Sequence, residues 1–183
     1  DFGDGLLMRE GFTIVNVGWQ FDVRKYLNPL LVGLDAPVAT DNGKPITGWV
    51  NPWFIPDKAG DSFEFTSGNN TRAYPPVDRK DPAYRLTVRE GWVAAPRLIP
   101  REDWQFGQMK DGQAVIDDNW LTLKGGFKAG QTYQLTYETK NPPVAGLGFA
   151  SIRDFASAIK NKADAVIKVQ YVYTYGESQV GRF

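Results

Sequence analysis

Short alternating runs, separated by Pro, Gly, Asn and Asp, dominate the chain between residues 24 and 140. Runs such as 62–66 and 84–89 alternate apolar and polar residues, which is the period of a half-buried strand. Asp41-Asn42-Gly43 and Lys110-Asp111-Gly112 stand between runs of this kind, and their residue types favour tight hairpin turns. Strands this short with turns this frequent predict antiparallel pairing. We therefore expect a large β-rich antiparallel unit over 24–140.

The two flanks of the chain have a different pattern. Residues 12–19 and 168–175 are β-branched and aromatic runs of strand length, apolar enough for a sheet that is covered on both faces. Between them, residues 145–162 carry apolar side chains at helical spacing. Helix followed by strand is the order of a doubly wound sheet. We expect an α/β core built from 1–23 and 141–183, with parallel strands at 12–19 and 168–175.

The last eight residues, Gly176 to Phe183, carry the strongest candidate for catalytic chemistry. A strand that runs into Gly-x-Ser and then a second glycine is typical of a nucleophile elbow, whose sharp turn holds the serine oxygen above the sheet. Ser178 would attack a carbonyl carbon, and the backbone N–H of Gln179 would donate to the oxyanion. The pattern places a small residue two positions after the serine, and Val180 departs from it. A branched side chain would crowd the turn unless it points into the sheet. A plain strand-end turn with a small polar Ser178 is the structural alternative.

The chain contains no histidine and no cysteine. The usual base of a serine nucleophile is therefore missing, and thiolate or imidazole metal sites are excluded. We expect no metal and no organic cofactor. Oxygen ligands remain, so the carboxylates at 102–103 and 117–118 leave a calcium site or a glycosidase pair open, with solvated turn acids as the simpler interpretation.

Charge and hydropathy exclude two classes of partner. Lys and Arg total 21, as do Asp and Glu, so no net basic field attracts nucleic acid. No stretch approaches the roughly 18 consecutive apolar residues of a membrane span. We expect neither nucleic acid nor membrane as a partner. The first residues lack the pattern of a signal peptide. The compartment is left unknown, with a secreted or periplasmic location in a bacterium kept open.

Several blocks of sequence, spread from end to end of the chain, carry a family resemblance. They are DFGDGLLMREGFT at 1–13, VGWQFD at 17–22, APR at 95–97, IPREDWQF at 99–106, NPPVAGLGFASIRDF at 141–155 and GESQVGRF at 176–183. Taken together they resemble a bacterial group of α/β-hydrolase domain proteins. The resemblance implies that 24–140 is an insertion and that 144–183 delivers the nucleophile.

The same resemblance implies a function and its limits. Members of this superfamily place the triad acid and the histidine after the nucleophile, so the chain would be a central fragment of a serine hydrolase acting on small carboxylic esters. It would be inactive alone, and a second polypeptide segment would complete the fold. Trp19 and Gln20, just past the end of a predicted strand, would line the substrate pocket. Packing of Trp19 in the core is the simpler alternative.

A different class of function also fits the composition. Aromatic residues make up 14% of the chain and include six tryptophans, which suits either a β-rich core or a stacking surface. The alternative function is a non-catalytic β-rich module that binds carbohydrate or protein. In that case Trp49, Trp53 or Trp92 would stack on sugar rings or contact another protein.

Overall fold

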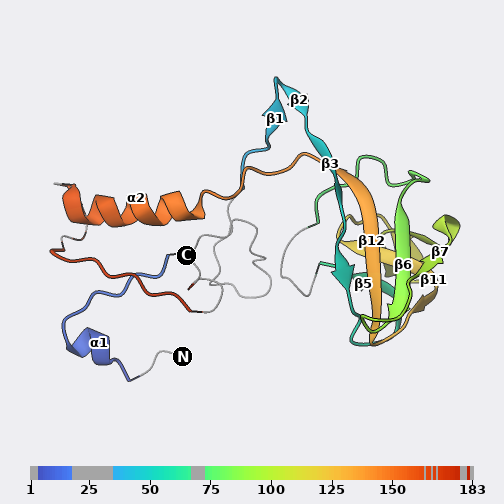
Figure 1. The fold of residues 1–183 in the computed structure, drawn as a ribbon, viewed down its shortest axis with the longest axis horizontal. Helices are drawn as coiled ribbons and strands as arrows, with labels where there is room; N and C mark the ends of the chain where they lie inside the picture. The colour runs from blue at the N-terminus through green and yellow to red at the C-terminus, as the bar shows by residue number, and fades with distance from the viewer. Residues whose placement is uncertain are drawn as a thin grey trace. The chain divides into compact units, whose positions relative to one another are not determined.

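The computed structural model describes residues 4–17, 35–66, 73–162, 164–165, 167, 169–177 and 181. The chain divides into two compact units. Unit 1 comprises Asp1–Phe21 and Ala145–Phe183, and unit 2 comprises Asp22–Val144. Figure 1 shows the strands gathered in unit 2, whereas helices α1 and α2 belong to unit 1.

Unit 2 is built from short strands with one turn of 3-10 helix, η3 (Arg101–Asp103). In chain order the strands are β1 (Thr40–Asp41), β2 (Lys44–Pro45), β3 (Thr47–Val50), β4 (Trp53–Phe54), β5 (Gly60–Glu64), β6 (Arg85–Glu90), β7 (Arg97–Ile99), β8 (Trp104–Phe106), β9 (Gln108–Lys110), β10 (Gln113–Val115), β11 (Trp120–Phe127) and β12 (Gln131–Lys140).

Two larger sheets and two hairpins organise these strands. The five-stranded sheet has the order β3-β12-β6-β7, with β4 also paired to β12, and the three-stranded sheet has the order β5-β11-β8. Strands β1 and β2 form one hairpin, and β9 and β10 form the other. Every strand pairing among the described residues is antiparallel. The predicted antiparallel character of the middle segment is confirmed.

The core lies between the inner faces of the two larger sheets. Along β12, Tyr133, Leu135 and Tyr137 are buried and alternate with more exposed residues, as period-two alternation predicts. Aromatic rings join the sheets: Phe106 of β8 lies 5.3 Å from Tyr137, and Phe127 of β11 lies 5.0 Å from Tyr133, centroid to centroid. Edge-to-face pairs of this kind add about 0.5–1.5 kcal/mol each beyond the area they bury.

Two hairpin turns have the backbone that their residues predict. Asn42-Gly43 joins β1 to β2 with φ angles of 49° and 77°, and Asp111-Gly112 joins β9 to β10 with 50° and 76°. Positive φ at both central positions is the type I′ turn, whose twist matches that of the flanking strands. The turn chemistry of the sequence is confirmed at both sites.

Unit 1 contains α1 (Leu6–Arg9) and α2 (Gly148–Asn161), and the helix expected over 145–162 is therefore present. The short α1 ends in a Schellman motif: Gly11, with φ of 84°, donates its N–H to the Met8 carbonyl, and Phe12 donates to the Leu7 carbonyl. Neither helix has a buried residue. Leu6, Leu7 and Met8 of α1 and Phe149 of α2 are each more than half exposed.

The prediction of an α/β fold is wrong, and with it the resemblance to the α/β-hydrolases. Residues 12–17 and the described residues of 168–175 form no strand, and the sheets contain no parallel pair among the described residues. A β-branched run becomes a strand only where a neighbour supplies backbone hydrogen bonds. Here the two runs meet through side chains, as in the edge-on contact of Phe12 with Tyr173 at 6.3 Å, without a ladder.

Candidate binding face

The residues predicted to carry catalysis, Ser178 and Gln179, lie outside the described residues, as do Trp19 and Gln20. Their assigned roles stay predictions. The segment that leads to Ser178 is described over 169–177 and forms no strand. The sheet that would hold a nucleophile elbow is therefore not formed by this segment.

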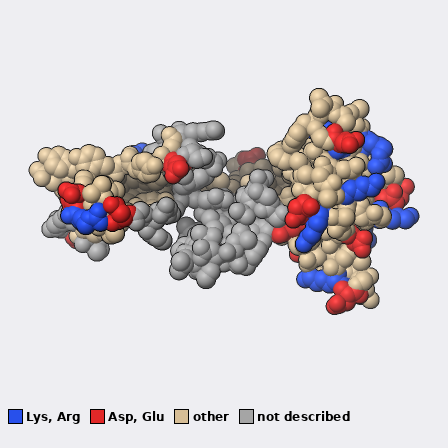
Figure 2. Space-filling model, turned by 90° about the horizontal axis from the view of Figure 1, so that it is seen from below, with Lys and Arg blue, Asp and Glu red and all other residues tan. Residues whose placement is uncertain are grey.

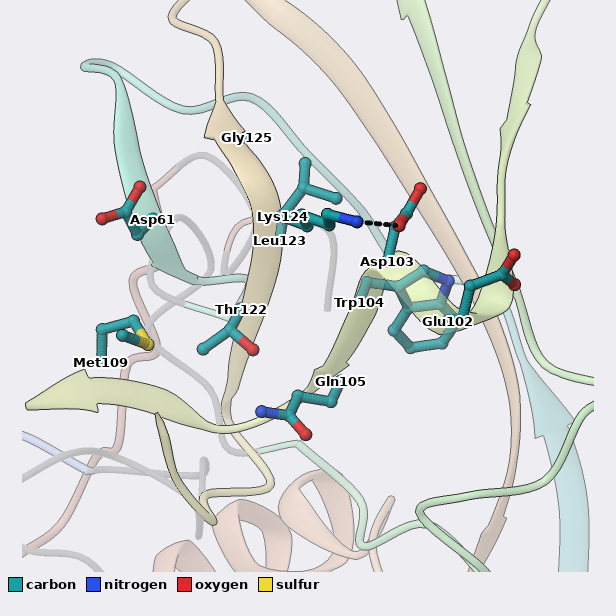
Figure 3. Close-up of a pocket in the computed structure, with 10 residues that line it drawn as sticks. All are labelled: Asp61, Glu102, Asp103, Trp104, Gln105, Met109, Thr122, Leu123, Lys124 and Gly125. Atoms are coloured by element: carbon teal, nitrogen blue, oxygen red, sulfur yellow. Dashed lines mark ion pairs between the residues drawn. The ribbon is translucent and has the colours of Figure 1, made fainter. Parts of the chain in front are cut away.

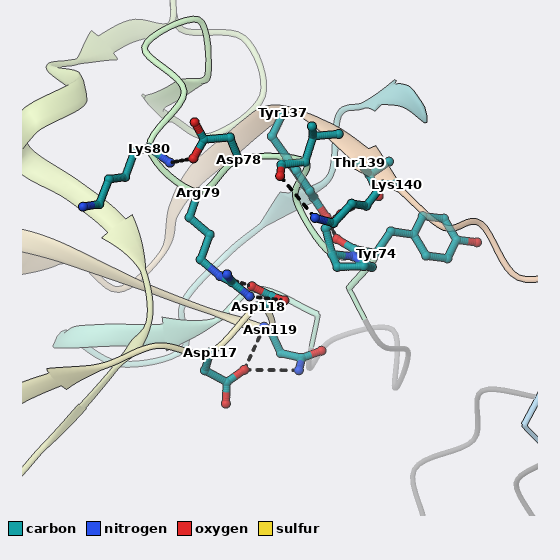
Figure 4. Close-up of polar contacts among 12 residues, drawn as sticks. Tyr74, Asp78, Arg79, Lys80, Asp117, Asp118, Asn119, Tyr137, Thr139 and Lys140 are labelled. Carbon is teal, nitrogen blue, oxygen red and sulfur yellow. Dashed lines mark hydrogen bonds and ion pairs between the residues drawn. The ribbon is translucent and has the colours of Figure 1, made fainter. Parts of the chain in front are cut away.

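The acidic residues at 117–118 take structural roles. Asp118 accepts hydrogen bonds of 2.7 and 2.9 Å from the Arg79 guanidinium, and this contact raises the pKa of Arg79 above its usual range. Asp117 accepts a 2.9 Å hydrogen bond from the backbone N–H of Asn119 (Figure 4). Within the described ranges no three carboxylates come close enough to hold a metal ion. Asp117 thus organises its own turn, and Asp118 joins that turn to the segment that carries Arg79.

A hollow of about 410 Å³ opens beside strands β8 and β11 of unit 2. Its acidic walls include Asp61, Glu102 and Asp103, and the Lys124 ammonium extends to within 3.8 Å of Asp103 (Figure 3). The Trp104 indole is 3% exposed, so it forms a wall and offers no free ring face. Solvated side chains of both signs surround this hollow without converging on one point.

A second hollow, of about 360 Å³, lies within unit 1. It is lined by Val15 and Val17, by Ile152 and Phe155 of α2, and by residues 172–176. The walls are mainly aliphatic and aromatic. They give the groove an apolar character without a distinctive set of polar groups to orient a ligand.

Exposed tryptophans distinguish unit 2 more clearly than either hollow. Trp49, Trp53 and Trp92 are 56%, 51% and 52% exposed. The rings of Trp53 and Trp92 meet edge to face, with centroids 4.6 Å apart and planes at 83°. The Arg89 guanidinium lies 5.2 Å from the centroid of the Trp92 ring, within the range of a cation–π interaction. Two half-exposed indoles are thus held in a fixed corner.

Strand register places this corner at one end of a row of side chains. Trp53 of β4 is opposite Gln134 of β12, Gln134 is opposite Thr87 of β6, and Thr87 is opposite Leu98 of β7. Residues directly opposite each other project from the same face of a sheet. Three strand spacings of about 4.8 Å make this row, which we name the middle row, roughly 14 Å long.

The contact between the two tryptophans crosses β12. Strand β4 pairs with one edge of β12, and β6, which precedes Trp92, pairs with the other. Thr132 of β12 lies opposite Arg89 and shares the face of Gln134, yet it is only 1% exposed. We attribute this burial to the crossing rings. The Thr132 hydroxyl has no hydrogen-bond partner among the described residues.

A further row lies on the other side of Gln134. The Thr136 hydroxyl is 2.9 Å from the Asn51 side-chain oxygen, and Arg85 is opposite Thr136. We name this surface of the five-stranded sheet, away from the core, the outer face. It is defined by Trp53, Arg85, Thr87, Arg89, Trp92, Leu98, Gln134 and Thr136.

Sequence reasoning named Trp53 and Trp92 but missed their polar neighbours. The run 84–89 does contain a signal, because Arg85, Thr87 and Arg89 alternate with apolar residues and must share one face. Which strand lies beside that face depends on the register with β12, and alternation within one strand does not specify it.

No helix within the described ranges combines the length and the apolarity that crossing a lipid bilayer requires. Comparisons with protein-family models, with curated proteins and with solved structures found no match to this chain. The role of the outer face therefore rests on its own geometry and chemistry.

Proposed function

We propose that unit 2 is a non-catalytic module that binds an oligosaccharide on the outer face. The observation that carries this proposal is the pair of half-exposed indoles, Trp53 and Trp92, fixed in contact at 4.6 Å. Large exposed aromatic rings are costly to leave in water and are typical of recognition surfaces.

The chemistry of a sugar ring suits such a corner. The two faces of a pyranose are rich in C–H groups, while its hydroxyls project from the rim. A C–H face packs on an indole and removes apolar surface from water. Trp92 is already held by Arg89 and Trp53, so binding has less side-chain freedom to remove.

The polar residues of the middle row favour a saccharide over a protein. Gln134 offers an amide donor and acceptor, and Thr87 offers a hydroxyl, between Trp53 at one end and Leu98 at the other. A protein–protein interface has the opposite anatomy, with an apolar centre and a polar rim. Hydrogen-bonding groups flanked by apolar ones match a ligand that presents hydroxyls between C–H surfaces.

A saccharide panel tests the proposal on the full chain. The purified protein is screened against immobilised neutral and acidic polysaccharides, and oligomers of each binder are titrated by intrinsic tryptophan fluorescence. We expect Trp53→Ala and Trp92→Ala each to weaken binding at least about tenfold, a loss of roughly 1.4 kcal/mol. Trp49→Ala is the matched control, because Trp49 is equally exposed but packs on Tyr84, away from the middle row.

Other outcomes would contradict the proposal. Absence of binding across the panel, or binding that survives both alanine substitutions, would remove the outer face as a saccharide site. Self-association of the chain that Trp53→Ala abolishes would identify the same face as a protein interface. Recovery of a shortened oligosaccharide after incubation would contradict the non-catalytic character.

A further inference from the structure

The charges around the middle row specify the ligand more narrowly. Resting on the proposed function, we infer that the outer face recognises an acidic saccharide, one whose sugar units carry carboxylates. Arg85 and Arg89 are the residues that would read those carboxylates. Both lie on β6 and share the face of Thr87.

The two arginines stand on opposite sides of the middle row. Arg85 precedes Thr87 by two residues and Arg89 follows it by two, so they are roughly 13 Å apart along the strand at about 3.3 Å per residue. A chain of sugars that starts on Trp53 and passes over Gln134 and Thr87 would therefore have a guanidinium on each side.

Neither arginine has an acidic partner among the residues that the structure describes. The ion pairs among the described residues join Arg9 to Asp4, Arg79 to Asp118, Lys124 to Asp103 and Arg153 to Asp154. Arg85 and Arg89 are absent from these pairs. A guanidinium offers a planar fork of donors that matches a carboxylate in bidentate geometry. Within the described part of the chain neither fork faces a carboxylate, and the Arg89 guanidinium also lies against the Trp92 ring.

The other charged groups near this face leave it positive. Glu138 projects from the same side of β12 but is opposite Trp49, one row beyond Thr136. Glu90 is the last residue of β6 and directly follows Arg89, so the alternation of the strand places it on the other face from Arg89. The Lys140 ammonium donates to the Val77 carbonyl at 3.2 Å. The rows that contain Thr132, Gln134 and Thr136 thus carry two arginines, Arg89 and Arg85, and no carboxylate on the outer face.

This positive charge is local. The chain as a whole has a net charge of zero, and Figure 2 shows acidic and basic side chains interspersed over the visible surface of unit 2. Binding of a nucleic acid backbone depends on a broad basic surface that neutralises many phosphates. Two arginines beside an aromatic corner suit the sparser carboxylates of a uronic acid chain.

Acidic oligosaccharides, each compared with its neutral methyl ester, test the inference. Oligogalacturonate, oligomannuronate and oligoguluronate are each titrated into the full chain by calorimetry, in parallel with their neutral methyl esters. We expect at least one acid form to bind about tenfold more tightly than its ester at low salt, with the difference shrinking as salt is added. Arg85→Gln should reduce that difference several-fold and affect binding of the ester much less than binding of the acid. Arg89→Gln should reduce the difference as well, and it should also weaken binding of the ester because it removes a contact of Trp92.

Controls separate charge recognition from structural damage. Arg89→Gln also removes a cation–π contact of Trp92, whereas Arg85 forms no such contact with an indole of the described residues, so Arg85→Gln is the decisive variant. Arg97 of β7 is exposed but is opposite Val88, so it does not belong to the outer face. Arg97→Gln should therefore leave the preference for the acid form intact. Circular dichroism confirms that each variant is folded.

The results distinguish failure of the inference from failure of the proposed function. If neutral oligosaccharides bind as tightly as acidic ones, and Arg85→Gln has no effect, the inference is overturned while saccharide binding stands. If no saccharide binds, both are overturned. Tighter binding of oligothymidylate than of any saccharide would overturn both in favour of single-stranded nucleic acid.

Discussion

Two buried tyrosines tie the segment 74–84 to β12. The Tyr137 hydroxyl donates to the Tyr74 carbonyl at 2.8 Å, and the Tyr84 hydroxyl donates to the Glu138 carbonyl at 2.9 Å. Both rings also belong to the core, where they are 1% and 2% exposed. Burial raises the pKa of both side chains, because the phenolate form would be poorly solvated there.

The raised pKa of Tyr137 predicts loss of stability in alkali. An unfolded tyrosine titrates near 10, so the folded protein holds this proton more tightly than the unfolded chain does. The stabilisation is complete below about pH 10 and is lost as pH rises through the folded pKa. We expect the free energy of unfolding to fall above pH 10, by up to about 1.4 kcal/mol per pH unit for each such tyrosine.

Urea denaturation between pH 8 and pH 11 measures this dependence. Tyr137→Phe should flatten the decline and, at neutral pH, cost about 1–2 kcal/mol because the Tyr74 carbonyl loses its partner. Tyr175→Phe is the control, since Tyr175 is 90% exposed and should leave the profile unchanged. Identical slopes for the parent and Tyr137→Phe would show that this hydroxyl is not protected by folding.

At the scale of elements, turn residues and the alternation of apolar and polar residues determine most of the strands and turns of unit 2. The type I′ turns at Asn42-Gly43 and Asp111-Gly112, and the strand that includes Leu86 and Val88, follow from local chemistry that a sequence displays. The outer face does not, because it joins β4, β12, β6 and β7, and only register decides which of their side chains are opposite.

The wrong prediction also belongs to this scale. The runs 12–19 and 168–175 have strong β-propensity, but a strand exists only when a second strand pairs with it. Their composition was compatible with a buried parallel sheet, yet the described residues of both runs are mostly exposed and unpaired. The β-propensity of these residues is real, but it carries no information about whether a second strand lies beside them to pair with.

A glycine in β11 provides a test of the irregular pairing between β11 and β5. The register shifts between Thr122 and Phe127, and Gly126 has φ of 77° there. A Cβ on Gly126 would lie 3.3 Å from the Gly60 carbonyl oxygen. Gly126→Ala should therefore lower the free energy of unfolding by about 1–3 kcal/mol, from left-handed strain and crowding together.

Gly48→Ala is the matched control in thermal or urea unfolding. Gly48 lies in β3 with a negative φ, and a Cβ there meets nothing within 4 Å. We expect this substitution to be neutral or to stabilise by up to about 1 kcal/mol. Equal effects of the two substitutions would mean that the β11 irregularity does not require glycine.

On the scale of the whole molecule, the two units differ in how they are stabilised. Every buried hydrophobic residue of the described chain lies between Phe54 and Tyr137, all within unit 2. In unit 1, α2 presents Ile152, Phe155 and Ile159 to an open groove and buries none of them fully. Burial of apolar surface is the main favourable term in folding, so unit 2 holds most of the stability.

Hydrogen exchange on the intact chain tests this difference. Amides of β12 should exchange only through global unfolding, whereas amides of α2 should exchange through local opening at a much lower free energy. Peptides from the two elements, followed by mass spectrometry in one sample, give the comparison directly. Equal protection of α2 and β12 would show that the chain unfolds as a single cooperative unit.

The central claim is that Trp53 and Trp92 form the ligand corner of the outer face. The most direct measurement follows the indole N–H resonances of the full chain by ¹⁵N NMR while the tightest-binding oligosaccharide of the panel is added. The account predicts that the signals of Trp53 and Trp92 shift together with one affinity, while that of buried Trp104 stays in place. Unmoved Trp53 and Trp92 signals at saturating ligand would contradict it.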